Sequence, residues 1–140
     1  MRAMETRDID SVYAIEIENF TDPWTIQTFE ESISQIDTYV LEDTEIVSYF
    51  VGQGVIDEYS IYNIAVKSTH QRKGIATHFL KMLIEKHNKT FTKYFLECRK
   101  TNDKAINFYT KFGFQPIYTR KEYYHNPTED ALIMKLDIGT

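Results

Sequence analysis

Apolar and polar positions recur along the chain with two periods, one typical of helices and one typical of strands. Near the N-terminus, a short strand at residues 1–4 precedes a mixed apolar stretch over residues 8–18. That stretch predicts a helix capped at Thr6 or Asp8. A second helix is predicted to begin at Thr25.

Three β-rich runs follow, separated by turn residues. They cover residues 38–42, 46–52 and 59–66, and their succession predicts an antiparallel meander. The last run is apolar at successive positions, as expected for a central strand covered on both faces. Residues 74–87 then carry apolar side chains at helical spacing, which predicts a helix that starts at Gly74 and packs on the sheet.

The rest of the chain alternates between strand and helix. The pattern predicts a strand at residues 94–98, a helix at 102–112 that Gly113 ends, a strand near 115–118 and a last strand at 131–136. Strands separated by helices indicate a mixed sheet with a parallel portion and helices on both faces. The fold class is therefore α/β (α+β).

Composition and charge exclude several function classes. With 42% apolar and 26% charged residues, the chain of 140 residues has ordinary globular usage, and we expect a single domain over residues 1–140. The net charge is −5 and the basic residues are scattered, which argues against direct nucleic-acid binding. Cys98 is the single cysteine, and we find no signal segment or membrane-length run. We expect a cytoplasmic monomer that does not bind a membrane.

One segment combines a strand end, a glycine and a helix start: Gln71-Arg72-Lys73-Gly74-Ile75-Ala76-Thr77. The first N–H groups of a helix lack internal partners and lie at the positive end of its dipole, so they can hold a diphosphate. Gly74 would let the backbone approach the phosphate oxygens, and Arg72 and Lys73 add positive charge. By spacing alone, a plain strand-to-helix turn fits equally well. The segment is neither a three-glycine dinucleotide fingerprint nor a P-loop.

Two motifs resemble those of the GNAT acetyltransferases. Gln71-x-x-Gly74-x-Ala76 after an apolar strand is similar to motif A, which binds the pyrophosphate of acetyl-CoA. Residues 95–114 are similar to motif B, in which a strand with an acidic residue leads through Asn102 to a helix ending in Phe-Tyr-x-x-x-Gly-Phe. The resemblance implies a GNAT fold with splayed parallel strands, acetyl-CoA as cosubstrate, and cofactor binding by residues 71–77.

Further segments resemble the ribosomal-protein-alanine N-acetyltransferases within that family. They are Phe20 to Thr25, Asn63 to Val66, Leu96 to Arg99, Arg120 to Tyr124, and Glu129 to Met134. This resemblance implies that the acceptor is a protein N-terminus, namely the N-terminal alanine of a small-subunit ribosomal protein. Ala76 in place of the second motif A glycine is a departure that bears on the substrate more than on the cofactor.

The resemblance also implies roles in the reaction. Glu97 matches the family's acidic residue and would take the proton of the amine directly or through water; a solvated strand carboxylate is the alternative. Tyr109 matches the position that protonates the leaving sulfur, although spacing alone favours a core tyrosine. The backbone N–H groups of Ile64, Ala65 and Val66 would bond the pantetheine arm and the thioester oxygen.

Several other residues have a structural interpretation beside a functional one. Asn102 is expected to cap its helix, and the resemblance adds a contact with pantetheine. Trp24, Tyr123 and Tyr124 are candidates for the acceptor groove, or are structural aromatics. Cys98 should face away from the candidate base, as a small core residue. The four histidines and one cysteine lack metal-ligand spacing, so we expect no metal.

Two rival functions remain open. The chain could run the same chemistry on another protein N-terminus, a lysine or a small amine. It could also be a non-catalytic acetyl-CoA-binding module, although the presence of both Glu97 and Tyr109 argues against a dead site.

Overall fold

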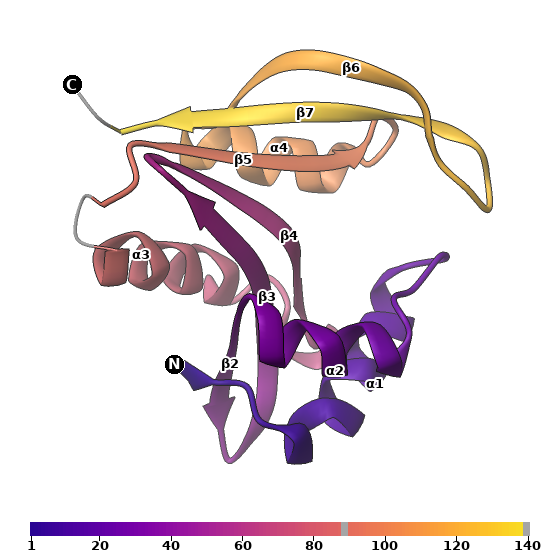
Figure 1. Ribbon diagram of the computed structural model, residues 1–140. Coiled ribbons are helices and arrows are strands. Elements are labelled where there is room, and N and C mark those ends of the chain that lie inside the picture. The colour runs from indigo at the N-terminus through magenta and orange to yellow at the C-terminus, as the bar shows by residue number, and fades with distance from the viewer. Residues whose placement is uncertain (88–89, 139–140) are drawn as a thin grey trace. The chain divides into compact units, whose positions relative to one another are not determined.

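The computed structural model describes residues 1–87 and 90–138. The strands are β1 Arg2–Ala3, β2 Asp37–Asp43, β3 Glu45–Val55, β4 Glu58–Val66, β5 Lys93–Arg99, β6 Gln115–Tyr124 and β7 Glu129–Asp137. The helices are α1 Ile9–Asn19, α2 Ile26–Gln35, α3 Ile75–His87 and α4 Asp103–Phe112, with 3-10 turns η1 Thr6–Asp8 and η2 Ser68–His70. Apart from the short turns, the elements follow the predicted order (Figure 1).

The strands of the described residues form one sheet of seven, in the order β1-β2-β3-β4-β5-β7-β6. Strand β2 pairs antiparallel with β1 and β3, and β7 pairs antiparallel with β5 and β6. Strands β4 and β5 are parallel over Glu58–Ile61 and Lys93–Leu96. The predicted mixed α/β class is confirmed, including the antiparallel N-terminal strands and the parallel portion.

The chain groups into two compact units. The first contains Met1–Gln53 and Tyr62–Asn88, and the second contains Gly54–Ile61 and Lys89–Thr140. Strand β4 contributes to both, because its first four residues belong to the second unit and the others to the first. The single domain expected over residues 1–140 stays a prediction.

In the first unit, α1 and α2 pack on β2 and β3 around an apolar core. Val12, Phe29, Val40 and Tyr49 are fully buried there. The predicted start of the second helix is confirmed, since α2 begins after Thr25, whose hydroxyl accepts the Thr28 N–H at 3.1 Å. Both helices thus bury apolar side chains in this core.

In the second unit, buried and partly exposed side chains alternate along β5, as expected for a strand with one covered face. Tyr94, Leu96 and Cys98 are buried, and the residues between them are partly exposed. Figure 1 shows α4 beside β5 and β7, and α4 ends where Gly113 adopts a φ of +126°, a conformation that favours glycine. The predicted core position of Cys98 is confirmed.

Strand β6 differs most from its prediction. The sequence predicted a strand over residues 115–118, whereas β6 runs to Tyr124. The strand lies at the edge of the sheet and is exposed at eight of its ten positions, so its side chains lack an apolar alternation that a pattern could detect. Its pairing with β7 is also irregular at Pro116/Tyr118 and Arg120/Tyr124.

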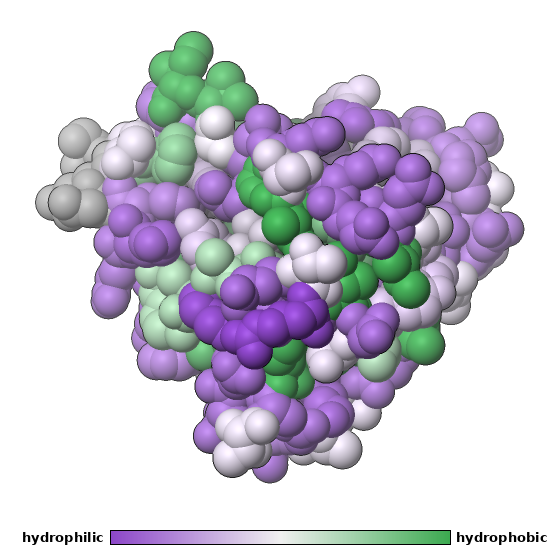
Figure 2. All heavy atoms as spheres, turned by 60° about the horizontal axis from the view of Figure 1, so that its bottom comes forward, coloured by the Kyte–Doolittle hydropathy of each residue, from purple (hydrophilic) through white to green (hydrophobic). Residues whose placement is uncertain are grey.

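Within the described part of the chain, no helix is long and apolar enough to cross a membrane. Figure 2 shows a face on which hydrophilic side chains predominate and apolar ones occur in smaller groups. Large apolar side chains are nevertheless exposed on and between the first two helices, at Ile17, Phe20 and Ile26.

Candidate cofactor and catalytic site

The predicted phosphate-binding turn is open around its glycine. Gly74 has a φ of +77°, and a Cβ built there would meet no protein atom within 4 Å. The first α-helical bond runs from the His78 N–H to the Gly74 carbonyl at 3.0 Å, so the N–H groups of Ile75, Ala76 and Thr77 precede it. Arg72 and Lys73 are exposed beside them. The turn therefore combines free space, helix-terminal donors and positive charge, as anion binding requires.

Gln71 has a structural task that its motif position did not reveal. Its amide donates to the Val66 carbonyl at 3.0 Å and to Asn19 Oδ1 at 3.0 Å. The Asn19 amide donates to the same Val66 carbonyl at 3.1 Å. The Gln71 side chain thus fixes the end of β4 to α1, and its backbone N–H donates to the Ser68 carbonyl at 3.4 Å.

The predicted pantetheine-binding residues occupy the C-terminal end of β4. Ala65 is buried, while Ile64 and Val66 are partly exposed. The Ser48 hydroxyl donates to the Ala65 carbonyl at 2.7 Å, and the Lys67 N–H donates to the Val47 carbonyl at 2.7 Å. Because these bonds fix the main chain, its donors can act without rearrangement.

The candidate base, Glu97, lies in the second unit with two neighbours from β6. Its side chain is 30% exposed, and Arg120 Nη1 is 3.4 Å from its carboxylate. The Tyr123 hydroxyl also bonds to Glu97; burial raises the pKa of Tyr123, and this hydrogen bond raises it further. The Arg120 guanidinium in turn lies 5.0 Å from the centre of the Tyr123 ring. The carboxylate is therefore held in place and still open to water.

Arg120 is the residue of this group that sequence reasoning missed. It lies in the Arg-Lys-Glu-Tyr-Tyr segment, to which no base-supporting role was attached. The register places Arg120 opposite Ala131 on β7, and Ile133 on β7 opposite Glu97. Only the full length of β6 brings this guanidinium beside the base.

The candidate acid, Tyr109, is part of the core of the second unit. It is 9% exposed, and its ring lies 5.2 Å from that of Phe108 and 5.6 Å from that of Phe114. Burial raises its pKa, with further contributions from Cys98 and Tyr124. The phenol is therefore protonated at neutral pH and able to donate. Both interpretations of Tyr109, core and proton donor, are compatible with this position.

Tyr124 links the surroundings of Tyr109 to those of Glu97. Burial raises its pKa, and Cys98 and Glu97 add to that effect. The Arg99 guanidinium lies 4.7 Å from the centre of its ring. The second unit thus gathers Glu97, Tyr109, Tyr123 and Tyr124 on neighbouring elements.

Two residues of the same unit have clear structural roles. The Asn102 side chain accepts the Ala105 N–H at 3.2 Å, which confirms the predicted cap of α4. Its pantetheine contact stays a prediction. Burial raises the pKa of the Cys98 thiol to about 11, so the thiolate that an acyl-cysteine route would need is scarce at neutral pH.

In the first unit, Trp24 is partly buried, with its ring 5.4 Å from that of Phe29. Its backbone N–H donates to Glu16 Oε2 at 2.8 Å. Glu16 also was missed from the sequence. In the sequence, the one indication is that this carboxylate directly follows Ile15. The structure buries both residues in α1.

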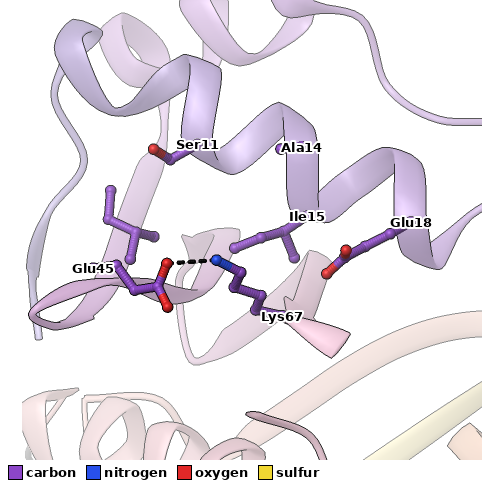
Figure 3. Close-up of a pocket in the computed structure, with 7 residues that line it drawn as sticks. Ser11, Ala14, Ile15, Glu18, Glu45 and Lys67 are labelled. Atoms are coloured by element: carbon purple, nitrogen blue, oxygen red, sulfur yellow. Dashed lines mark hydrogen bonds and ion pairs between the residues drawn. The ribbon is translucent and has the colours of Figure 1, made fainter. Parts of the chain in front are cut away.

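A hollow of about 150 Å³ lies in the first unit. Its lining, drawn as sticks in Figure 3, is Ser11, Ala14, Ile15, Glu18, Glu45, Ile46 and Lys67. Lys67 Nζ and Glu45 Oε1 form an ion pair there at 2.5 Å. The hollow contains no predicted site residue. Over residues 1–87 and 90–138, no group of three or more His, Cys, Asp or Glu side chains could hold a metal ion.

Comparison with known proteins shows where the chain belongs. Residues 9–114 match the Acetyltransferase (GNAT) family. A relative from Bacillus subtilis (strain 168) is 35% identical over 144 aligned positions, which cover 99% of this chain and 95% of the relative. The [ribosomal protein bS18]-alanine N-acetyltransferase of Escherichia coli (strain K12) is 32% identical over 98% of this chain and 96% of its own length.

Solved structures agree with this assignment. The crystal structure of the ribosomal-protein-S18-alanine N-acetyltransferase from Escherichia coli has a TM-score of 0.88 at 30% identity, covering 99% of this chain and 93% of that one. Ard1 from Thermoplasma volcanium, at 24% identity and a TM-score of 0.89 over 99% of this chain and 97% of its own, shares the fold. The chain therefore belongs to the GNAT family and is an acetyl-CoA-dependent N-acetyltransferase.

Proposed function

We propose that this enzyme acetylates a protein N-terminus, and that its acceptor is the N-terminal alanine of a ribosomal protein of the bS18 type. The observation that carries the proposal is the end-to-end similarity to enzymes of one acceptor class. Relatives named as bS18-alanine N-acetyltransferases are 31–32% identical over 97–98% of this chain. Similarity over that length includes the segments outside the cofactor motifs, where acceptors are selected.

The cofactor supplies an acetyl thioester, and the residues of the two resembling motifs are those expected to hold it. The turn at Gln71–Thr77 would bind the pyrophosphate through helix-terminal N–H groups, Arg72 and Lys73. The N–H groups of Ile64, Ala65 and Val66 would bond the pantetheine arm and the thioester oxygen. Asn102 would add a contact with pantetheine.

Glu97 would act as the general base. An α-amine has a pKa near ~8, so most of it carries a proton at neutral pH that must leave before attack on the thioester. The carboxylate is reachable by water, and Arg120 and Tyr123 orient it. It can therefore accept that proton directly or through one water molecule.

Tyr109 would return a proton to the departing thiolate. Its phenol holds its proton at neutral pH because burial raises its pKa. That burial also makes the phenol a weak acid. A thiolate in equally buried surroundings is a stronger base than one in water, as the raised pKa of the nearby Cys98 thiol illustrates. Burial would thus raise the pKa of the donor and of the leaving thiol in the same direction.

Trp24, Tyr123 and Tyr124 would contact the acceptor peptide. The Tyr123 hydroxyl bonds to Glu97, so an amine beside that phenol would also be beside the base. Trp24 is held by its backbone rather than by its ring nitrogen, which leaves its side chain to shape an apolar contact.

Mass spectrometry of the product tests the acceptor directly. Unacetylated bS18 would be incubated with acetyl-CoA and the enzyme, with a copy lacking the N-terminal alanine as the matched control. We expect one acetyl group, on the α-amine of the alanine, and none on the control. Acetyl groups on lysine side chains, or on both proteins equally, would favour the rival acceptors.

A further inference from the structure

Glu16 is a carboxylate buried in the first unit, with 1% of its surface exposed. Its Oε2 accepts the backbone N–H of Trp24 at 2.8 Å. Its Oε1 accepts the Asn63 amide at 2.7 Å and also the Tyr49 hydroxyl. Burial raises the pKa of Tyr49, so its phenol keeps the proton that it donates. Both carboxylate oxygens of Glu16 therefore accept hydrogen bonds.

Stability alone gives little reason for a carboxylate at this position. Taking the charge out of water is costly, and an apolar side chain of similar volume is often as good or better for the free energy of folding. What the carboxylate adds is geometry, because it holds three donors from separate segments at fixed positions. Those segments are the α1–α2 loop, β3 and β4.

Two of the three segments are those to which binding roles are proposed above. Trp24 lies in the loop that would receive the acceptor peptide. Asn63 directly precedes Ile64, Ala65 and Val66, whose N–H groups would bond the cofactor's arm. One side chain therefore sets the position of the loop relative to this strand.

We propose that Glu16 is a positioning residue for the acceptor. It holds the α1–α2 loop through the Trp24 N–H, while Asn63 and Tyr49 fix the carboxylate itself. The role of Glu16 in acceptor binding rests on the proposed function. The hydrogen bond from the Trp24 N–H to Glu16, which is the tether of the loop, does not. Glu16 is not proposed to contact the thioester or the amine.

The test variant is Glu16→Met, which keeps side-chain length and removes every acceptor. Trp24 is the single tryptophan, so its fluorescence reports on the loop alone. We expect a red-shifted emission, stronger quenching by acrylamide, and a KM for the acceptor peptide raised about tenfold, the effect of losing one buried hydrogen bond. The kcat and the KM for acetyl-CoA should change much less.

Tyr49→Phe is the matched control. It removes a donor to the same carboxylate but keeps the ring that packs against Phe29 at 5.6 Å, and it leaves the Trp24 bond in place. Because the Asn63 amide still holds the carboxylate in this variant, its Trp24 fluorescence and its peptide KM should match those of the wild type. Unchanged quenching and peptide KM in Glu16→Met, or equal changes in both variants, would overturn the proposal.

A measurement on the unaltered protein covers the case in which Glu16→Met does not fold. Amide hydrogen exchange followed by NMR should show the Trp24 N–H protected, although it belongs to a loop. Exchange at the rate of an unstructured peptide would refute the tether. If the wild type turns over no N-terminal peptide, the proposed function fails, and quenching and exchange still decide whether the tether exists.

Discussion

The two side chains proposed to carry the chemistry both lie in the second unit, in different surroundings. Glu97 is partly exposed and bonded to Tyr123, whereas Tyr109 is buried among aromatic rings. The first environment suits a group that exchanges protons with water, and the second suits one that keeps its proton until a strong base forms beside it. Two substitutions separate these roles.

Glu97→Gln removes the base and keeps an oxygen for the Tyr123 hydroxyl. We expect kcat to fall by about 10²- to 10⁴-fold, the usual contribution of a general base, while the Kd for acetyl-CoA stays unchanged. Steady-state rates and a binding titration measure the two quantities. A parallel loss of both would show that Glu97 supports the fold or the cofactor instead.

Tyr109→Phe removes only the phenolic oxygen, because phenylalanine keeps the ring contacts with Phe108 and Phe114. We expect single-turnover chemistry to slow by about 10²-fold with Tm little changed. A variant with the wild-type rate would leave Tyr109 as a core residue alone.

Asp8 makes folding stability depend on pH. It is 4% exposed, and it accepts two bonds from Arg2 and one from the Glu5 N–H. The hydrogen bonds from Arg2 lower its pKa in the folded protein, so its stabilising effect is complete above the unfolded value of about 3.9 and is lost as the pH falls through the lower folded value.

Urea unfolding as a function of pH measures this effect. Asp8→Asn should lower the free energy of unfolding at pH 7, and its difference from the wild type should shrink below about pH 4. Arg2→Gln should remove the same pH-dependent part. A difference that stays constant down to pH 2 would contradict the assignment.

Among the elements, α1 and the start of α3 hold the segments of the first unit that are proposed to bind the cofactor. Asn19 of α1 donates to the Val66 carbonyl, and Glu18 of the same helix accepts the Ser68 N–H at 2.7 Å. Both bonds fix the chain between β4 and the turn that leads to α3. Helix α1 therefore supports the binding elements from behind, while Gly74 gives the turn its shape.

Two glycines with positive φ provide a matched pair for testing that turn. The methyl group of Gly74→Ala would meet no neighbouring atom, so the free energy of unfolding should fall only by the left-handed backbone strain of about 1–2 kcal/mol. The same methyl group would lie at the phosphate and should raise the Kd for acetyl-CoA about tenfold. Gly113→Ala at the end of α4 would lie 3.1 Å from Leu136 and should lower stability without changing that Kd. Equal Kd values in both variants would remove Gly74 from the cofactor site.

In the molecule as a whole, most helices and strands could be predicted because the residues that start, stop or pattern them are close together in the sequence. The Thr25 and Asn102 caps, the Gly113 stop and the alternation along β5 are all visible within a few residues of sequence. The later part of β6 could not be predicted, since an exposed edge strand has no buried face to produce a pattern.

Long-range hydrogen bonds were equally hidden from the sequence. The partners of Glu16 lie 8, 33 and 47 positions away, and those distances carry no sequence signal. The same holds for Arg120 beside Glu97 and for the Gln71 amide beside Asn19. The candidate site could thus be predicted as a set of motif residues, but not the groups that hold them in place.

The most direct test of the central claim is a thiol-release assay with acetyl-CoA and three peptides. One copies the N-terminus of bS18 with a free alanine, the second is the same peptide with its α-amine blocked, and the third carries a lysine behind a blocked N-terminus. We expect turnover of the free alanine peptide alone. Turnover of the lysine peptide at a similar rate, or no turnover despite tight binding of acetyl-CoA, would contradict it.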